Sequence, residues 1–268
     1  MCNFYQLIDS GHEKKLEQFG LYRLIRPAAA AIWHPKLPQE EWDKADGVFS
    51  REGKSHWKRP IKKTWNVKIG GIAFKLAATD FGHIGVFPEH EEVWHWSADR
   101  IKPGDHVLNL FAYSGGATLA CVKAGAEVCH VDASKGTVEW ARENAALNNL
   151  DAAPIRWIVD DVVKFLKREL KRGRRYDGII LDPPTFGRGS QGQVFKIERD
   201  LPALLGMLAQ FKPRFISLSC HTGSFTPLIL KRLLQDPFNG GVFEEGELQL
   251  KGPGAYLPNG TYARWVRD

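Results

Sequence analysis

An aspartate followed by two prolines has the clearest chemical meaning in this sequence. Asp182, Pro183 and Pro184 follow a short apolar run, residues 178–181. Because each proline fixes its own φ and restricts the residue before it, the pair forms a rigid turn. Such a turn would hold the Asp182 carboxylate in an open position, and Phe186 offers a flat face to a planar ring. The pattern indicates a site that orients a planar group beside a carboxylate.

A glycine-containing loop and a second acid follow two earlier apolar runs. The segment Asn109-Leu110-Phe111-Ala112-Tyr113-Ser114-Gly115-Gly116 leads directly into a predicted helix, and Asp132 ends the next apolar run. Glycines leave backbone amides accessible at a helix start, and an acid after the second strand can bind both hydroxyls of a ribose. Alone, each feature could be structural, since Asp132 and Ser134 could cap the next helix. Together they favour a cofactor that contains adenosine.

The residues that follow two further apolar runs can each be interpreted in two ways. Asp160 and Asp161 follow the third apolar run, where a carboxylate could bond an adenine amino group or cap the following helix; spacing alone favours the cap. Cys220 and His221 follow the fifth run. A thiolate there could be a nucleophile, but a free cysteine is as often an inert core residue. Cys121 and Cys129 are interpreted as core.

Apolar strands and amphipathic helices alternate after residue 100, which predicts an α/β fold. The predicted strands cover residues 106–111, 127–132, 155–158, 178–181 and 215–218, and the predicted helices cover 116–124, 135–148, 161–172, 196–210 and 226–235. Uninterrupted apolar strands between helices are typical of a parallel sheet covered on both faces, a doubly wound arrangement. Residues 247–251 and 261–267 flank a Gly/Pro-rich turn and predict an antiparallel C-terminal hairpin. Ligands of such sheets bind at the carboxyl ends of the strands, where the acids above lie.

Residues 1–98 predict a small β-rich N-terminal domain, followed by the α/β domain over 99–268. Val67–Ile69 and Ile72–Leu76 flank Gly70-Gly71, a pair that tolerates the positive φ of a hairpin turn. Residues 83–87 predict a further strand, and 89–98 a short helix. Turn-forming residues near 97–103 place the boundary.

Composition excludes several classes of protein. The 268 residues are 43% hydrophobic and 25% charged, which is ordinary for a globular chain, and the net charge of +6 permits an anionic partner without requiring one. Four cysteines without a CxxC pair indicate a reducing compartment, and we find neither a signal peptide nor an apolar run of 18 residues. We therefore expect a cytoplasmic protein with no membrane contact.

The strand ends resemble those of the class I S-adenosylmethionine-dependent methyltransferases, and in particular the ribosomal RNA large-subunit methyltransferase I-like group. The resemblance covers about residues 66–268 and rests on five segments in family order, which are Leu108–Gly115, Val131–Ser134, Glu139–Asn144, Asp161-Val162 and Leu181–Pro184. It implies a Rossmann-like sheet and S-adenosyl-L-methionine as cofactor. It also implies that 109–115 hold the methionine end, that Asp132 binds the ribose and Asp161 the adenine, and that Asp182, Pro183 and Pro184 flank the target base.

The resemblance points to two different target atoms. In the cytosine-5 branch of the group a cysteine after the fifth strand is the nucleophile, and Cys220 matches it. Carbon 5 needs a thiolate to add to carbon 6 first, whereas a nitrogen needs only orientation of its lone pair. The group also contains guanine-N7 enzymes with the sequence Asp-Pro-Pro-Thr-Phe, present here at 182–186. We favour cytosine C5 through a Cys220 adduct at this point, with a ring or exocyclic nitrogen as the alternative.

Two basic segments could contact RNA, and the resemblance implies ribosomal RNA. Lys58, Arg59 and Lys62 lie among tryptophans in residues 51–68, a pattern suited to phosphate pairing and base stacking. Seven cations crowd residues 164–175, where a solvated helix face is the simpler interpretation. No metal is predicted, because His90 and His95 are five residues apart and leave different faces of a helix.

The sequence therefore predicts an enzyme, a methyltransferase acting on a nucleobase of RNA. A nicotinamide-dependent oxidoreductase on a similar sheet is a further alternative, which the absence of a GxGxxG pattern disfavours. A catalytically silent RNA-binding module would leave Asp182 and Cys220 without a function.

Overall fold

Two units make up the chain, and the computed structural model describes residues 4–51, 56–59, 61, 64–188 and 194–268. The first unit comprises 1–91 and 249–259, and the second comprises 92–248 and 260–268. The N-terminal stretch of the first unit thus ends at Glu91. The reason is the helix α2 (Glu91–Ala98), whose Trp94 packs so closely on Gly116 of the second unit that a Cβ there would lie 2.4 Å from the indole.

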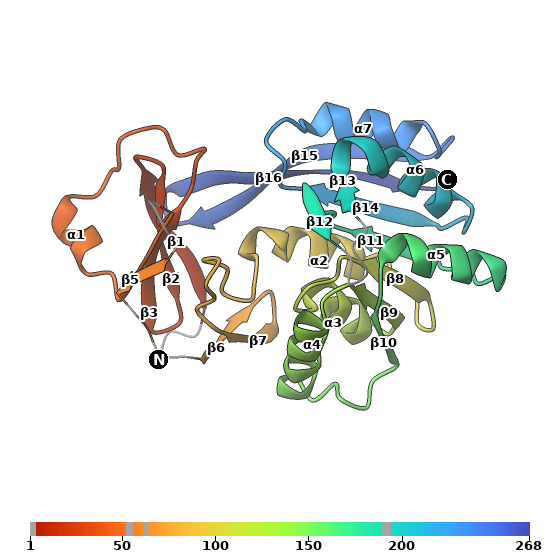
Figure 1. Cartoon of the computed structure of the whole chain (residues 1–268), viewed down its shortest axis with the longest axis horizontal. Coiled ribbons are helices and arrows are strands. Elements are labelled where there is room, and N and C mark those ends of the chain that lie inside the picture. Colours follow the sequence, from red (N-terminus) through yellow and green to blue (C-terminus); the bar gives the residue numbers. More distant parts are fainter. Residues whose placement is uncertain (1–3, 52–55, 60, 62–63, 189–193) are drawn as a thin grey trace. The chain divides into compact units, whose positions relative to one another are not determined.

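The second unit is built on a seven-stranded sheet with the order β10-β9-β8-β11-β14-β16-β15 (Figure 1). The first five strands are parallel and β16 is antiparallel to β14. Their bounds are β8 His106–Leu110, β9 Glu127–Asp132, β10 Ile155–Val159, β11 Gly178–Leu181, β14 Phe215–Cys220, β15 Val242–Gly252 and β16 Ala255–Val266. The strand order reverses beside β8, so the predicted doubly wound, mostly parallel sheet with an antiparallel hairpin is confirmed.

Helices cover both faces of this sheet. Side chains of α5 (Val162–Lys171), α6 (Ile197–Ala209) and α7 (Pro227–Gln235) pack with Leu108, Leu110 and Leu181 in one apolar core. The alternate residues of β8 and β9 face α3 (Gly116–Lys123) and α4 (Lys135–Leu147), because successive strand residues point to opposite faces. Cys121 and Cys129 lie in the core as predicted, and burial raises their pKa to about 12 and about 11.

A short ribbon follows β11 and was not predicted. Its strands β12 (Phe186–Arg188) and β13 (Val194–Lys196) pair antiparallel, with Phe186 opposite Lys196. Three-residue strands carry too little periodicity to be recognised from sequence.

The first unit contains a five-stranded sheet in the order β1 to β5 and a separate hairpin of β6 and β7. The bounds are β1 Tyr5–Gly11, β2 Lys14–Phe19, β3 Tyr22–Pro27, α1 Gln39–Asp43, β4 Gly47–Ser50, β5 His56–Arg59, β6 Trp65–Ile69, β7 Ile72–Leu76 and the 3-10 turn η1 Pro88–His90. The predicted hairpin is confirmed, with φ of 56° and 76° at Gly70 and Gly71. The expected strand at 83–87 was wrong: the positive φ of Gly85 interrupts it, and Gly82 just before it also has a positive φ, although Ile84 is buried.

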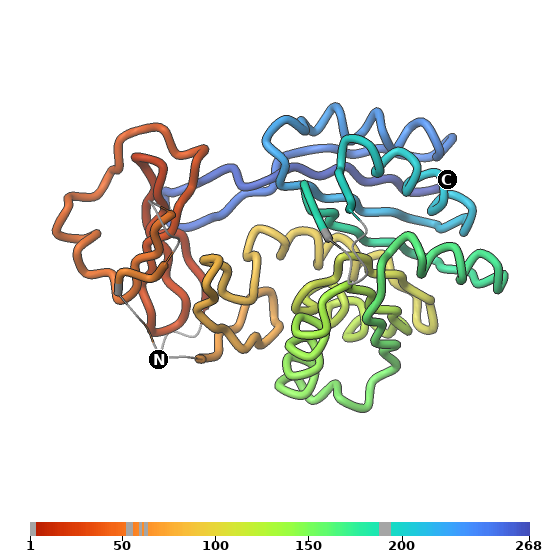
Figure 2. Tube along the Cα trace, viewed as in Figure 1, coloured from red at the N-terminus to blue at the C-terminus, as the bar shows by residue number. Residues whose placement is uncertain are grey.

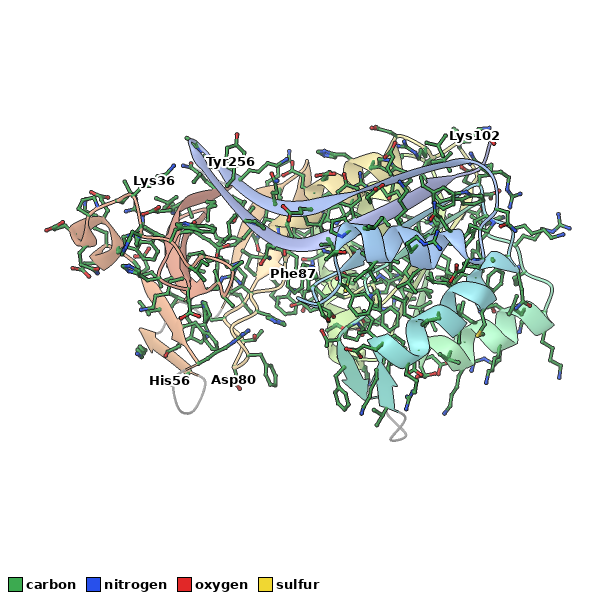
Figure 3. The ribbon with its side chains drawn as sticks, turned by 90° about the horizontal axis from the view of Figure 1, so that it is seen from above. Lys36, His56, Asp80, Phe87, Lys102 and Tyr256 are labelled. Atoms are coloured by element: carbon green, nitrogen blue, oxygen red, sulfur yellow. The ribbon has the colours of Figure 1, made fainter. Side chains whose placement is uncertain are left out.

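Residues 249–259 return to the first unit as the end of the long β15–β16 hairpin, which the tube trace follows (Figure 2). Leu250 and Leu257 pack with Leu7 in a small apolar core. The Lys36 ammonium donates to the Gly254 carbonyl at 3.2 Å, in the turn before Tyr256 (Figure 3). None of the helices in the described part of the chain is long and apolar enough to cross a membrane.

A buried carboxylate joins α5 to β10. Glu169 is fully buried and accepts hydrogen bonds from Arg156 (2.7 and 3.2 Å), Tyr176 (2.6 Å) and Arg172 (2.9 Å). Burial alone would raise the pKa of Glu169, but these donors outweigh it and hold the pKa at about 2.

We expect Glu169→Gln to lower the free energy of unfolding by about 2–3 kcal/mol at pH 7, because the two arginines lose a buried charge partner. Since the folded-state pKa lies below the unfolded value near 4.5, the stabilisation is complete above pH 4.5 and is lost as the pH falls toward 2. Urea unfolding of both proteins between pH 7 and 2.5 checks this. An equal difference at every pH would contradict it.

Candidate functional site

The loop between β8 and α3 is held in an unusual conformation. Phe111, Tyr113 and Gly115 have φ of 54°, 48° and 90°. Left-handed backbone costs about 1–2 kcal/mol at each of the two aromatic residues, so the surroundings must stabilise it. The Ala112 amide donates to the Val131 carbonyl (3.1 Å), and the Asn144 side chain donates to the Ser114 carbonyl (2.9 Å). The loop is therefore clamped from β9 and α4.

Asp132 lies at the end of β9 and takes part in this clamp. One carboxylate oxygen accepts from the Tyr113 amide (3.0 Å), and the other accepts from the Ser134 amide (2.9 Å) and the Thr137 hydroxyl (2.9 Å). A carboxylate offers about four acceptor positions, so one remains for a ligand hydroxyl. Ser134 caps α4 by accepting from the Thr137 amide (3.3 Å).

Asp161 caps α5, as its spacing favoured. Its Oδ1 accepts from the Lys164 amide at 2.9 Å, so the cap uses only one of the two carboxylate oxygens. The side chain is half-buried. The helix α3 behind the glycine loop has no side-chain cap, so the first turn presents backbone amides at the carboxyl edge of the sheet.

Asn109 does not face this edge. It is buried on β8, and its amide nitrogen donates to the Thr118 hydroxyl, which in turn contacts His130 Nδ1, both at 2.9 Å. Burial lowers the pKa of His130 to about 3, so the ring is neutral. The geometry assigns Asn109 to the interior of the fold, beneath the loop.

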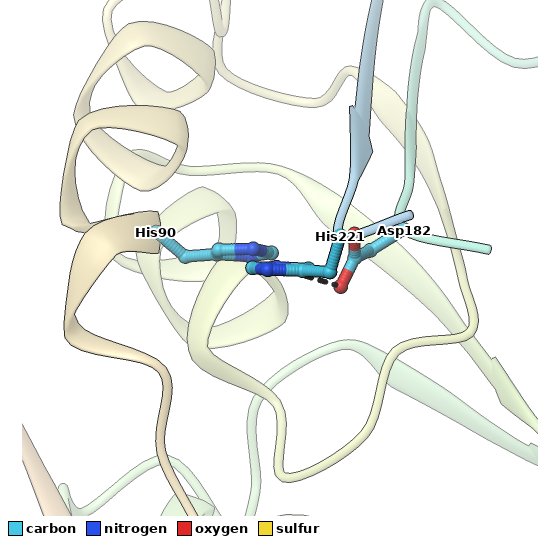
Figure 4. Close-up of side chains that lie close together, drawn as sticks. All are labelled: His90, Asp182 and His221. Atoms are coloured by element: carbon cyan, nitrogen blue, oxygen red, sulfur yellow. Dashed lines mark ion pairs between the residues drawn. The ribbon is translucent and has the colours of Figure 1, made fainter. Parts of the chain in front are cut away.

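Asp182 follows β11 and is held between two residues of the neighbouring strand end. The Ser219 hydroxyl donates to Asp182 Oδ1 at 2.8 Å, and His221 Nε2 lies 3.8 Å from Oδ2 (Figure 4). About a quarter of the Asp182 side chain is exposed (27%), so the group reaches solvent or a ligand. Pro183 is buried and Pro184 exposed. The rigid turn thus presents a fixed, partly open carboxylate.

The segment after Pro184 contacts two neighbouring loops at this edge of the sheet. Thr185 Oγ1 lies 2.7 Å from Thr222 Oγ1, which ties this loop to the one after β14. The Phe195 ring lies 5.5 Å from the ring of Phe111, so the β12–β13 ribbon contacts the glycine loop. Phe186 is half exposed on that ribbon. Ser219 and Phe195 could not be identified from the sequence, because neither belongs to a recognisable motif.

Cys220 belongs to the apolar core, and the Asp182 carboxylate is near enough to contribute to the raised pKa of its thiol. Its neighbour Ser219 faces Asp182, and since successive strand residues alternate, the Cys220 side chain enters the apolar core on the other face. The thiol is fully buried, and burial raises its pKa, which the Thr222 amide donating to Sγ at 3.3 Å only partly offsets.

The basic segment predicted to bind RNA belongs to the first unit. Lys58 is exposed on β5, whereas Lys62 and the side chain of Arg59 lie outside the described residues. The two tryptophans between which they lie are anchored: the Trp57 indole donates to the Thr79 carbonyl (2.9 Å) and the Trp65 indole to the Phe19 carbonyl (3.2 Å).

A family model and a solved structure that match this chain are both those of S-adenosylmethionine-dependent methyltransferases. Residues 49–214 match the S-adenosylmethionine-dependent methyltransferase family. The crystal structure of a SAM-dependent methyltransferase from Agrobacterium tumefaciens is 39% identical with a TM-score of 0.92, over 98% of this chain and 90% of that one.

Two curated relatives are ribosomal RNA methyltransferases. A large-subunit methyltransferase K/L of Pseudoalteromonas atlantica is 35% identical over 159 residues, and a large-subunit methyltransferase I of Aeromonas hydrophila is 33% identical over 144. These matches cover 58% and 53% of this chain but only 22% and 36% of the relatives, so the chain spans a minor part of each. Since the family match extends over more than half of the chain and the Agrobacterium protein is matched almost throughout, the chain belongs to the S-adenosylmethionine-dependent methyltransferases, which use S-adenosylmethionine as methyl donor.

Proposed function

We propose that this chain methylates a ring or exocyclic nitrogen of a nucleobase in RNA, with RNA of the large ribosomal subunit as the substrate. The observation that carries the proposal is the Asp182 carboxylate, partly exposed and fixed by Ser219 beside His221. The names of the curated relatives support the class of substrate.

The residues at the carboxyl edge suit the methyl donor. Asp132 retains one acceptor position for a ribose hydroxyl, Asp161 has a carboxylate oxygen not used by its cap, and the uncapped start of α3 offers amides to a carboxylate. When bound, the donor supplies a methyl group on a positively charged sulfur. Phe111, Tyr113, Ser114 and Gly115 form the backbone that would lie along it.

Asp182 has two tasks toward the base in this proposal. Its carboxylate accepts a hydrogen bond from a base N–H and so fixes the nitrogen lone pair. On an exocyclic amine it takes the proton that the nitrogen loses, whereas on a ring nitrogen its negative charge compensates the positive charge that the base acquires. Phe186 offers its exposed face for stacking.

The route through carbon 5 of cytosine is less well supported. It requires a Cys220 thiolate at the edge, but the thiol lies in the core, on the opposite face of β14 from Ser219, and its pKa is raised. We therefore prefer the nitrogen target to the cytosine C5 adduct that the sequence favoured.

Trapping tests the choice between these targets. RNA that carries 5-fluorocytosine should form no stable covalent adduct, and Cys220→Ala should keep kcat within about threefold, because a buried neutral thiol is not a nucleophile. An adduct formed by the parent protein and absent in Cys220→Ala would instead establish the cytosine route.

Transfer of a labelled methyl group tests the substrate class. Large-subunit ribosomal RNA, DNA of matched length and a protein extract are compared under the same conditions. The proposal predicts label in RNA; label in protein or DNA alone would contradict it.

A further inference from the structure

A pocket of about 630 Å³ lies at the amino ends of β8, β9 and β10 in the second unit. Its walls include the first residues of β8 and β9, His106 and Glu127, together with Arg156 of β10. Arg174, Arg175 and Tyr176, which connect α5 to β11, complete it. Since these strands are parallel, the pocket lies at the edge of the sheet opposite Asp132 and Asp182, and the proposed methyl transfer does not use it.

The pocket is positively charged. Three arginines line it against one carboxylate, and that carboxylate, Glu127, lies 3.3 Å from His106 Nδ1. Arg174 and Arg175 are exposed, and among the described residues no carboxylate lies within ion-pair distance of either. Two uncompensated guanidinium groups at one opening provide a site for a phosphate, which they can bind through paired hydrogen bonds.

Further exposed cations lie on α5, outside the pocket. Lys167 and Lys171 are exposed at four-residue spacing and, within the described chain, have no ion-pair partner. Arg168, on the same helix, and Arg172, which caps its C-terminus, are neutralised by Asp160 and Glu169. Lys167, Lys171, Arg174 and Arg175 thus form a row of unpaired cations, which we name the amino-edge strip.

The structure holds the pocket end of the strip in place. The Gly173 amide donates to the Leu170 carbonyl (3.0 Å) and the Arg174 amide to the Glu169 carbonyl (3.1 Å), so the turn after α5 is closed by backbone bonds. Gly173 has a φ of 64°, which favours glycine at this turn. Glu169 also fixes Arg156 and Tyr176 in the pocket wall. Backbone and side-chain hydrogen bonds therefore fix the segment that carries Arg174 and Arg175.

We propose that the amino-edge strip and its pocket bind the phosphate backbone of the RNA substrate, at a second contact separate from the base that is methylated. A row of four cations that extends from the pocket along about one turn of α5 exceeds what one phosphate requires and matches successive phosphates of a strand. The proposal rests on the proposed function, since it takes RNA to be the substrate.

Salt-dependent binding of large-subunit ribosomal RNA tests this contact. Arg174→Ala/Arg175→Ala should reduce the slope of log K against log salt by about 1.5 and weaken binding by about 5–30-fold near 0.1 M salt, because each lost phosphate contact removes roughly 0.7–0.9 of the slope. Lys167→Ala/Lys171→Ala should have a smaller effect in the same direction. At saturating RNA, kcat should remain unchanged while KM rises.

The matched control is Lys212→Ala/Arg232→Ala, which removes two exposed cations outside the strip and changes the net charge equally. It should leave the slope within about 0.3 of the parent. Affinity for S-adenosylmethionine checks that every variant is folded.

Three results would overturn the inference. If the parent binds and methylates RNA but the arginine variant has the same slope as the control, the contact does not exist although the proposed function stands. If a mononucleotide or inorganic phosphate saturates the pocket without weakening RNA binding, the pocket is a small-anion site. If the parent neither binds nor methylates RNA, the proposed function fails and the inference fails with it.

Discussion

Asp182→Asn is expected to lower kcat for methyl transfer by about a thousandfold, while the affinity for S-adenosylmethionine changes by less than about tenfold. The amide cannot take a proton and carries no charge to compensate a positive base, and such contributions are worth about 10²–10⁴ in rate. Size and shape are preserved, so Ser219 can still donate to the side-chain oxygen. Single-turnover kinetics with saturating RNA, together with calorimetry of donor binding, separates the two quantities.

Ser219→Ala provides the graded comparison. It removes only the 2.8 Å hydrogen bond that orients Asp182, so kcat should fall by about tenfold and the dependence of the rate on pH should keep its shape. If Asp182→Asn reduced kcat no more than Ser219→Ala does, the carboxylate would have a positioning role alone and the proposed chemistry would be wrong.

Asp132→Ala is expected to weaken donor binding by at least about a hundredfold. The substitution removes the acceptor for a ribose hydroxyl and also the acceptor of the Tyr113 amide, which holds the left-handed loop. Hydrogen bonds to a charged group contribute about 1.5–3 kcal/mol each, so two of them account for the expected loss. Calorimetric titration with S-adenosylhomocysteine measures it directly.

Thr137→Val is the control for this variant. It deletes one of the three hydrogen bonds to Asp132 and leaves the carboxylate in place, so the affinity should change by about fivefold at most. Unaltered donor affinity in Asp132→Ala would show that the cofactor does not bind at this strand end.

The doubly wound sheet could be predicted from the sequence, because apolar runs between amphipathic helices are typical of a parallel sheet covered on both faces. The order of its strands could not, because the runs do not show which strands are neighbours. The hairpin at Gly70-Gly71 was predictable for the same kind of local reason, since the glycines permit the positive φ that the turn has. The strand predicted at 83–87 is not formed, because an apolar composition alone does not exclude the positive φ that Gly85 adopts within it.

The orientation of single side chains could not be predicted. All six residues of β14 are buried, so the run has no polar alternation to show which side chains face the site. In the structure Ser219 bonds Asp182, whereas the next residue, Cys220, lies in the core. Because Cys220 and not Ser219 lies in the apolar core, the preferred target atom changes from carbon 5 of cytosine to a nitrogen. Asn109 is the converse case: it lies in the glycine-loop motif but bonds Thr118 in the interior. Such assignments depend on the register of packed elements, which no local pattern encodes.

Identification of the methylated nucleoside tests the central claim most directly. Large-subunit ribosomal RNA from a strain that lacks this chain is incubated with the purified protein and isotope-labelled S-adenosylmethionine, digested to nucleosides and analysed by mass spectrometry. We predict a single labelled nucleoside whose methyl group is on a base nitrogen, formed by the parent and by Cys220→Ala but not by Asp182→Asn. Labelled 5-methylcytidine, or an RNA fraction without label, would contradict the account.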